Sequence, residues 1–265
     1  MANIIEVKNL TKRFNGLAAV DNISFSVAPG EIFAFLGPNG AGKTTTIKIL
    51  TTLLQPTSGD CSIAGASSLS DEKHVRRSFG IVFQDPSLDD ELTAWENMYF
   101  HAVLYRVDKA LRRERIKQLL EFVELWDRRN DLVKKFSGGM KRRLEIARGF
   151  LHHPKVLFLD EPTLGLDPQT SRAIWERVKD MNKNEGTTVF FTTHYMAEAE
   201  RMADRVAIID HGKIVMQGTV PELLAATKTD NLEDAFLALT GKKIRESEAT
   251  GLDSLRERHT LWRRR

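Results

Sequence analysis

A glycine-rich octapeptide constrains the fold of this chain more than any other part of the sequence. Residues 37–44 read GPNGAGKT and match the pattern G-x-x-x-x-G-K-[ST]. A short apolar run precedes them at 32–36, and a segment with helical patterning follows at 43–54. This context predicts a strand, a phosphate-binding loop and a helix, in that order. The alternative is a glycine-rich turn that binds nothing.

The residue types in the loop suit polyphosphate binding. Glycines let the backbone wrap closely around phosphates, and the loop N–H groups and helix start present partial positive charge. Lys43 adds a full charge for the β and γ phosphates, and the Thr44 hydroxyl can coordinate Mg²⁺. We expect a continuous stretch to contact the nucleotide: Gly37, Pro38, Asn39, Gly40, Ala41, Gly42, Lys43, Thr44 and Thr45.

Two adjacent carboxylates complement the loop. Four apolar residues at 156–159 lead directly into Asp160 and Glu161, which predicts a buried strand that ends at the ligand-binding edge of a sheet. Asp160 suits a magnesium shell, and Glu161 suits polarising a water for attack on a γ phosphate. The alternative is a strand with a solvated acidic end.

The hydrophobic pattern predicts an α/β fold. Short strands are expected at 4–7, 23–27, 32–36, 61–65 (an edge strand), 80–83, 156–159, 188–191 and 206–209, and a tight hairpin at 210–213. A helix is expected at 171–183, and a helical stretch at about 90–153 interrupts the alternation as an insertion. Within this stretch, helical spacing in the segment 111–125 puts four apolar residues on one face: Ile116, Leu119, Leu120 and Val123. Alternating strands and helices argue for a parallel sheet covered by helices.

Composition excludes several classes of protein. The single cysteine, Cys61, cannot form an intrachain disulfide, and no apolar run approaches the ~18 residues of a membrane helix. Residues 1–10 lack the layout of a signal peptide, so we expect a soluble chain. The net charge of +3 is too small to indicate nucleic-acid binding, and no nucleic-acid partner is expected. The excess lies in residues 241–265, which hold eight basic and four acidic residues.

A third motif carries a family resemblance. Residues 136–140, FSGGM, precede the helical segment 141–148 and resemble the signature motif of ATP-binding cassette (ABC) proteins. The ordered set of phosphate loop, Gln84, signature, Asp160-Glu161, Asp167 and His194 also resembles that family, over roughly residues 4–220. Met140 and Phe136 depart from the commonest pattern, Gln and Leu. The serine and both glycines remain, so we expect ATP binding to be intact.

Three segments narrow the resemblance. Residues 137–143 (SGGMKRR), 193–199 (THYMAEA) and 232–236 (LEDAF) are similar to the daunorubicin-resistance and sodium-export type of ATPase subunit. The resemblance implies an ATP-hydrolysing subunit that powers a separate permease for export of a drug, another small molecule or an ion. An importer ATPase, a soluble ABC ATPase and a nucleotide-gated regulator are the alternatives.

The resemblance also implies roles for individual residues. Phe14 would stack on adenine, or it is a core aromatic; Gln84 would reach Mg²⁺ and the attacking water, or it is a surface residue. His194 would contact the γ phosphate, which makes it catalytic together with Lys43 and Glu161. Asp167 would lie in a dimer-contacting loop, and it can also cap the following helix. A second phosphate-binding site is implied at Ser137, Gly138 and Gly139.

The implied architecture has several parts. An antiparallel β subdomain and the inserted helical subdomain (about 90–153) would join the parallel core in one ABC domain at 4–220. A short extension with a basic tail would follow at 221–265. Two cassettes would meet head to tail, most simply as a homodimer, with ATP and Mg²⁺ between them. The subunit would be cytoplasmic and peripheral on the inner face of the membrane.

Two surface hypotheses complete the analysis. Residues 85–100 resemble the family's coupling region, in which Leu88, Leu92, Trp95 and Met98 either form a groove for a permease helix or belong to a helix core. The basic tail, which ends in three arginines, either contacts anionic lipid or is merely solvated.

Overall fold

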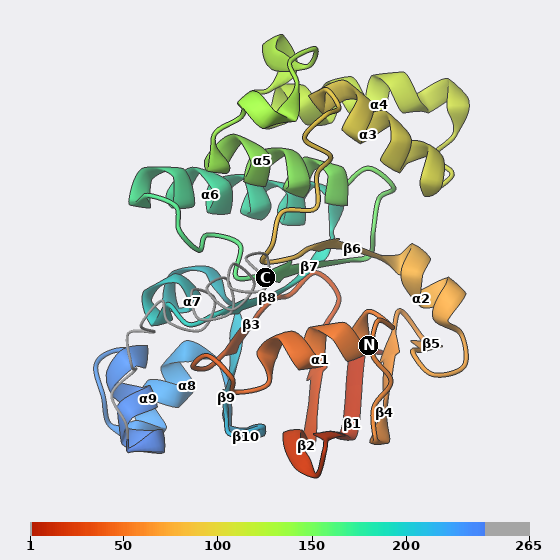
Figure 1. Ribbon diagram of the computed structural model, residues 1–265. Coiled ribbons are helices and arrows are strands. Elements are labelled where there is room, and N and C mark those ends of the chain that lie inside the picture. The colour runs from red at the N-terminus through yellow and green to blue at the C-terminus, as the bar shows by residue number, and fades with distance from the viewer. Residues whose placement is uncertain (1, 242–265) are drawn as a thin grey trace, which may run out of the picture.

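A six-stranded sheet forms the centre of the computed structural model, which describes residues 2–241 (Figure 1). Its strand order is β10-β9-β3-β8-β7-β6, and only β10 runs antiparallel to its neighbour. The strands are β3 (Ile32–Leu36), β6 (Phe79–Val82), β7 (Val156–Asp160), β8 (Thr188–Thr193), β9 (Arg205–Asp210) and β10 (Lys213–Gly218). All residues of β3, β7 and β8 are buried, as expected for parallel strands covered on both faces.

A second, antiparallel sheet has the order β2-β1-β4-β5. Its strands are β1 (Ile5–Phe14), β2 (Leu17–Val27), β4 (Ser58–Ile63) and β5 (Ala66–Ser67). The expected strands at 4–7 and 23–27 were too short, because Asn15 and Gly16 both have positive φ and form a hairpin turn that joins β1 to β2. The expected edge strand at 61–65 is also a correction: it corresponds to β4, which lies inside the sheet, and β5 is the edge.

Helices flank the sheets. They are α1 (Lys43–Leu50), α2 (Glu72–Ser78), α6 (Pro168–Glu185), α7 (Met196–Met202), α8 (Val220–Thr227) and α9 (Leu232–Thr240). The helix expected at 43–54 ends earlier, because Thr52 adopts φ 62° and the Leu53 and Leu54 N–H groups turn back to the Lys48 carbonyl. The helix expected at 171–183 begins earlier, at Pro168.

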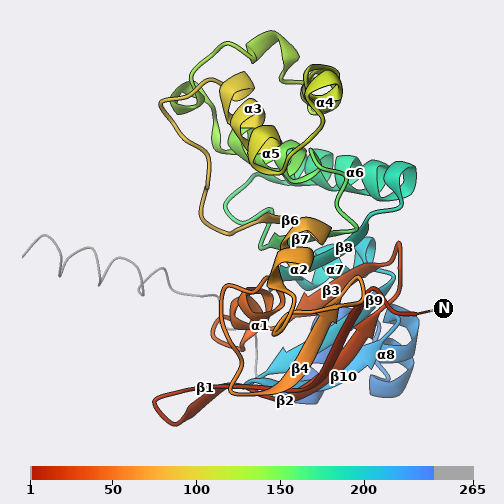
Figure 2. The same cartoon turned by 90° about the vertical axis from the view of Figure 1, so that its right-hand side faces the viewer.

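The inserted segment is helical, as expected. It contains α3 (Ala94–Leu104), α4 (Lys109–Phe122), two short 3₁₀ helices (Trp126–Arg128 and Val133–Lys135) and α5 (Gly138–Gly149). Figures 1 and 2 show α3, α4 and α5 together on one side of α6, away from the antiparallel sheet. The predicted apolar face is confirmed, since Ile116, Leu119, Leu120 and Val123 are all buried.

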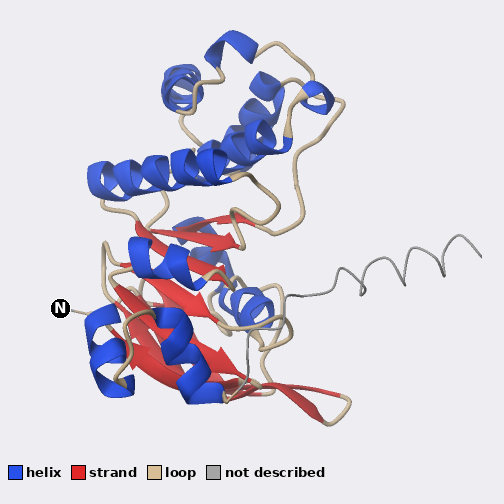
Figure 3. Ribbon diagram, turned by 90° about the vertical axis from the view of Figure 1, so that its left-hand side faces the viewer, coloured by secondary structure: helices blue, strands red, loops and turns tan. Residues whose placement is uncertain are grey.

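The C-terminal helices belong to the same folded body. Leu223 of α8 and Leu232 and Phe236 of α9 are buried in the core cluster that also contains Leu36 and Leu159. Figure 3 shows the helices and strands of this arrangement in separate colours. The basic tail falls at 242–265, outside the described residues. Across residues 2–241, every helix is too short or too polar to cross a membrane.

Candidate functional site

The glycine-rich loop leaves the end of β3 and leads directly into α1, as the sequence predicts. Two of its glycines have no room for a side chain. A Cβ on Gly42, which has φ 110°, would lie 2.4 Å from the Ala19 carbonyl oxygen. A Cβ on Gly37 would lie 2.3 Å from the Ile209 carbonyl oxygen. Because neighbouring strands hold the backbone this closely, the loop path requires glycine.

Lys43 turns back over this loop. Its ammonium group donates hydrogen bonds to the carbonyl oxygens of Gly37 (2.7 Å) and Pro38 (3.2 Å). It also lies 3.1 Å from Oε1 of Glu161, and both side chains are about 6% exposed. The β3–α1 loop and the end of β7 are thereby joined through a buried ion pair.

Asp160 ends β7 beside the start of α1. It is 1% exposed, and its Oδ1 accepts hydrogen bonds from the hydroxyls of Thr44 (3.4 Å) and Thr192 (2.5 Å). Two of the three residues predicted as magnesium ligands, Thr44 and Asp160, are therefore adjacent. The alternative of a solvated acidic strand end is wrong, because Asp160 and Glu161 are both buried.

Glu161 has a strained backbone conformation and a fixed side-chain partner. Its φ is +48°, which is costly for a residue with a Cβ and is typical of functional sites. Its Oε2 lies 2.9 Å from His194 Nδ1. Burial by itself would raise the pKa of Glu161, but the His194 hydrogen bond and the Lys43 charge outweigh burial and lower it. The residue is therefore ionised at neutral pH, as a general base must be.

Oε1 of Glu161 is held by an ion pair and not by a well-aligned hydrogen bond. Among the described residues, Oε1 is buried and accepts no hydrogen bond of good geometry, although the Lys43 ammonium lies 3.1 Å away. A buried acceptor whose partner is a single ammonium group can hold a water when that group moves away. Lys43, Glu161 and His194, the three residues expected to be catalytic, thus form one cluster.

The remaining predicted residues lie outside this cluster. Ser137 begins α5, and its hydroxyl accepts the Met140 N–H at 3.3 Å. No hydrogen bond or ion pair within residues 2–241 links Ser137, Gly138 or Gly139 to Lys43 or Asp160. Figures 1 and 2 show α1, which follows the glycine-rich loop, and α5, which begins at the signature, on opposite sides of β7, so a single chain keeps its two expected phosphate-binding segments apart.

Phe14, Gln84 and Asp167 have distinct environments. Phe14 is 46% exposed at the end of β1, so the interpretation as a core aromatic is wrong, and the Lys12 ammonium lies 5.1 Å from the ring centroid. Gln84 follows β6 and is exposed. Asp167 caps α6 by accepting the N–H groups of Gln169 and Thr170, each at 3.0 Å, so its capping role is confirmed.

Sequence reasoning missed the contacts of four polar residues behind the cluster. The Thr192 hydroxyl donates to Asp160 and accepts the Glu161 N–H at 3.1 Å. Glu198, on α7, accepts the Thr163 hydroxyl at 2.6 Å and the Thr193 hydroxyl at 3.4 Å, and so joins the segments that follow Glu161 and precede His194. The signal was a pair of threonines next to a histidine, at the end of a strand whose centre is apolar.

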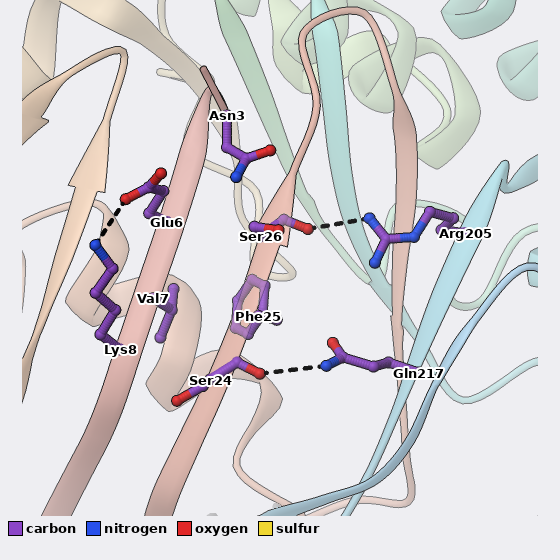
Figure 4. Close-up of a pocket in the computed structure, with 9 residues that line it drawn as sticks. All are labelled: Asn3, Glu6, Val7, Lys8, Ser24, Phe25, Ser26, Arg205 and Gln217. Carbon is purple, nitrogen blue, oxygen red and sulfur yellow. Dashed lines mark hydrogen bonds and ion pairs between the residues drawn. The ribbon is translucent and has the colours of Figure 1, made fainter. Parts of the chain in front are cut away.

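A hollow of about 290 Å³ lies elsewhere, between β1, β2 and the β9–β10 hairpin (Figure 4). Figure 4 shows the carbonyl oxygens of Ser26 and Ser24 accepting hydrogen bonds from Arg205 (3.2 Å) and Gln217 (3.5 Å). These bonds connect the two sheets, so we assign this hollow a structural role.

Comparison with known proteins identifies the class of protein that this fold and site define. The family model described as ABC transporter matches residues 20–164. The chain belongs to this family, and it carries the ATP-binding, ATP-hydrolysing cassette.

Two relatives with assigned names are similar to this chain over most of its length. The chain is 43% identical over 219 residues to the daunorubicin/doxorubicin resistance ATP-binding protein DrrA of Streptomyces peucetius, covering 83% of this chain and 66% of that protein. It is 40% identical over 220 residues to the Nod factor export ATP-binding protein I of Burkholderia lata, covering 83% of this chain and 72% of that protein.

Two solved structures share the fold. An ATP-binding subunit of an ABC transporter matches with a TM-score of 0.82 at 33% identity, covering 89% of this chain and 99% of that one. A dimeric post-hydrolysis state of the ATP-binding cassette MJ0796, bound to ADP and Pi, matches with a TM-score of 0.73 at 28% identity, covering 81% and 98%. The predicted ABC cassette fold, with its parallel core, antiparallel sheet and inserted helices, is confirmed.

Proposed function

We propose that this chain is the ATPase subunit of an exporter for a drug or another small molecule, and that two copies work with a separate membrane permease. The cluster of Lys43, Glu161 and His194 at the glycine-rich loop carries the proposal. It combines a phosphate cradle, an ionised base and an orienting imidazole, which are the parts that ATP hydrolysis requires. Export is supported by relatives named for drug resistance and for Nod factor export.

The proposed reaction assigns one task to each residue. Lys43 exchanges its bonds to the loop carbonyls for bonds to the β and γ phosphates. Glu161 holds the attacking water at Oε1, which the Lys43 ammonium leaves when it turns to the phosphates, and takes the proton of this water, while His194 orients Glu161 and contacts the γ phosphate. The exposed ring of Phe14 stacks on adenine, which needs only an aromatic face.

The residues present fit a magnesium ion. The Thr44 hydroxyl and the Asp160 carboxylate are hard oxygen ligands and lie next to one another, and Gln84 is exposed and available from the β6 end. Within residues 2–241 no group of three or more His, Cys, Asp or Glu side chains could hold a metal ion by itself. This matches Mg²⁺, which is bound by one or two protein groups together with phosphates and water. When bound with ATP, the ion would neutralise developing negative charge on the phosphates.

A head-to-tail dimer would complete the site. Ser137 and the glycines at the start of α5 offer a hydroxyl and a helix N-terminus, which attract anions, yet they do not reach Lys43 in their own chain. We propose that they bind the nucleotide held by the other copy, with Asp167 at the contact. The dimeric form of the similar MJ0796 cassette supports this arrangement.

The permease contact is proposed on the inserted helices. The groove expected from Leu88, Leu92, Trp95 and Met98 finds little support, because Met98 is fully buried and Leu88 and Trp95 pack against the core. Instead, α3 exposes four other apolar side chains: Tyr99, Phe100, Val103 and Leu104.

A basic hollow adjoins this apolar face. Its volume is about 490 Å³, Leu104 forms part of its wall, and its basic residues are Lys73, Arg76, Arg77 and Arg106. Together the two features suit a permease segment with apolar and acidic side chains. A subunit bound to such a segment would lie at the inner face of the membrane. The Phe100→Asp variant should lose co-purification with the permease. Leu111→Asp, at an exposed position of α4, is the matched control and should retain it.

The Glu161→Gln variant tests the proposed chemistry. It keeps the size of the side chain but removes the base, so ATP binding should remain while phosphate release falls by about a hundredfold or more. The same variant should accumulate as an ATP-dependent dimer in light scattering. Turnover like that of the wild type would refute Glu161 as the base.

Two competing functions have separate tests. A nucleotide-gated regulator would bind ATP without releasing phosphate from the wild-type chain. The direction of transport separates an importer from an exporter. In inverted vesicles that contain the chain and its permease, an exporter would move substrate into the lumen, whereas an importer would move it out. The retained Glu161–His194 pair favours hydrolysis over regulation alone.

A further inference from the structure

Three charged side chains of α5 form hydrogen bonds with the backbone on both sides of Gln84. Arg142 donates hydrogen bonds to the carbonyl oxygens of Phe83 (2.6 Å) and Gln84 (3.0 Å). Glu145 accepts the Ser87 N–H at 2.7 Å and the Ser87 hydroxyl at 3.2 Å. Arg148 donates to the Ser87 carbonyl oxygen at 2.8 Å and also contacts the Ser87 hydroxyl. Both flanks of Gln84 are therefore attached to the helix that begins at the signature motif.

Two of these three side chains, Arg142 and Glu145, are buried and paired with each other, whereas the Arg148 contacts to Ser87 are exposed. Arg142 and Glu145 form an ion pair at 3.1 Å, with side chains 8% and 1% exposed. Buried charges are costly unless every polar atom finds a partner, and here the Gln84 segment supplies those partners. Hydrogen bonds to charged groups are stronger than those between neutral groups. This arrangement, which we call the α5 clamp (Arg142, Glu145 and Arg148), is more than an ordinary loop contact.

The two ends of α5 differ in their attachment. At the C-terminal end, a Cβ on Gly80 of β6 would lie 2.2 Å from the Gly149 carbonyl oxygen, so helix and strand touch through their backbones. At the N-terminal end, about 18 Å away along the helix, the close neighbour is a side chain: a Cβ on Gly139 would lie 2.7 Å from Cγ2 of Thr170. The α5 clamp lies between this fixed point and the signature, so a tilt of α5 about Gly149 would displace the segment 83–87.

We propose that Arg142 and Glu145 are positioning residues that make Gln84 move with the signature helix, so that engagement of the signature by nucleotide sets the place of Gln84 in its own chain. This inference rests on the proposed role of Gln84 at the nucleotide site. A tether through fixed charge pairs would transmit small tilts of α5, because such pairs tolerate little change in geometry.

The test uses the Glu145→Gln variant of the full chain. Glutamine keeps the shape and one acceptor oxygen, but it removes the charge and turns an NH₂ group toward one of the former donors. Glu121→Gln is the matched control, because Glu121 is exposed on α4 and pairs with Lys117 across one helical turn. Ser87→Ala is a milder variant at an exposed position that removes the hydroxyl contacts and keeps the backbone bonds.

Hydrogen exchange and kinetics provide the readouts. Loss of a charged hydrogen bond should speed amide exchange in the segment 83–88 about ten- to a hundredfold in Glu145→Gln. The kcat for ATP should fall about tenfold while the dissociation constant for ATP stays within about twofold. Ser87→Ala should show the same changes to a smaller degree, and Glu121→Gln should show neither.

ATP-dependent exchange in a Glu161→Gln background tests the coupling itself. Without the further substitution, ATP should change exchange at the start of α5 and in 83–88 together. With Glu145→Gln added, the α5 response should remain and the response of 83–88 should disappear. The inference is overturned if exchange in 83–88 is unchanged, if kcat stays within twofold, or if both responses persist. If the wild type releases no phosphate, the proposed function is refuted. The hydrogen-exchange measurements would still test whether the α5 clamp couples the segment 83–88 to α5.

Discussion

Replacing Thr192 by valine would test how the acidic end of β7 is held. Thr192 is fully buried, its hydroxyl donates to Asp160 Oδ1 at 2.5 Å, and it accepts the Glu161 N–H at 3.1 Å. Valine has nearly the same volume, so the change removes the hydroxyl without opening a cavity. The Glu161 N–H keeps its second bond to the Thr192 carbonyl oxygen at 3.1 Å. The main loss is therefore the bond to the Asp160 carboxylate.

The magnitude follows from the charge on that acceptor. A hydrogen bond to a charged group contributes roughly 1.5–3 kcal/mol, and an ordinary neutral bond about 0.5–1.5 kcal/mol. Thr187→Val is the matched control, because Thr187 is also buried but donates to the neutral carbonyl oxygen of Pro154 at 3.0 Å. The free energy of unfolding should thus fall by about 2 kcal/mol for Thr192→Val and by about 1 kcal/mol for Thr187→Val.

Urea unfolding followed by tryptophan fluorescence gives the stability, and phosphate release gives the activity. The kcat of Thr192→Val should fall by about ten- to a hundredfold, since 1.4 kcal/mol of lost transition-state stabilisation is a factor of ten. Thr187→Val should retain the wild-type kcat. The reasoning is refuted if Thr192→Val destabilises no more than Thr187→Val, or if it retains full activity.

Three further predictions follow from the structure. Because the pKa of Glu161 lies below its ordinary value of 4.5, ionised Glu161 contributes fully to stability above pH 4.5, and this contribution is lost as pH falls through the lower folded-state pKa. An acid limb of the pH–rate profile that lies above pH 4.5 and disappears in Glu161→Gln would contradict this. Burial, together with the charges of Arg148 and His152, lowers the pKa of His101 from 6.5 to about 3. Below pH 6.5 the imidazole therefore binds a proton in the unfolded state but not in the folded state. The free energy of unfolding should fall by up to about 1.4 kcal/mol for each pH unit as pH is lowered from 6.5 to 3. Chemical unfolding of His101→Phe at several pH values should show a shallower slope, and an unchanged slope would argue against this assignment. Gly80→Ala should destabilise the chain by about 2 kcal/mol or more, because its Cβ would meet the Gly149 carbonyl oxygen at 2.2 Å, and a wild-type melting temperature would disprove the close contact.

Much of the fold could be predicted because its signals are local. Buried parallel strands read as short apolar runs, and the residues 32–36 and 156–159 correspond closely to β3 and β7. The errors arose where a few residues override periodicity. Asn15 and Gly16 turn β1 into β2 and lengthen both strands, and the positive φ of Thr52 ends α1 early. Which strand forms an edge depends on pairing between distant segments, so it could not be read from 61–65 alone.

The candidate site divides in the same way. The sequence by itself determined the phosphate loop and the carboxylates at the end of β7, because each motif is a short run with fixed spacing and strand ends meet at one edge of a parallel sheet. The role expected for His194, which follows β8, came from the resemblance to the ABC family. Only the tertiary structure decided that Glu161 touches both Lys43 and His194, since these contacts join segments more than thirty residues apart. The same holds for the α5 clamp, whose partners lie about sixty residues from each other. Spacing along a chain fixes which groups are present, whereas packing between elements fixes which of them meet, and hydrogen bonds and ion pairs act only over a few ångströms.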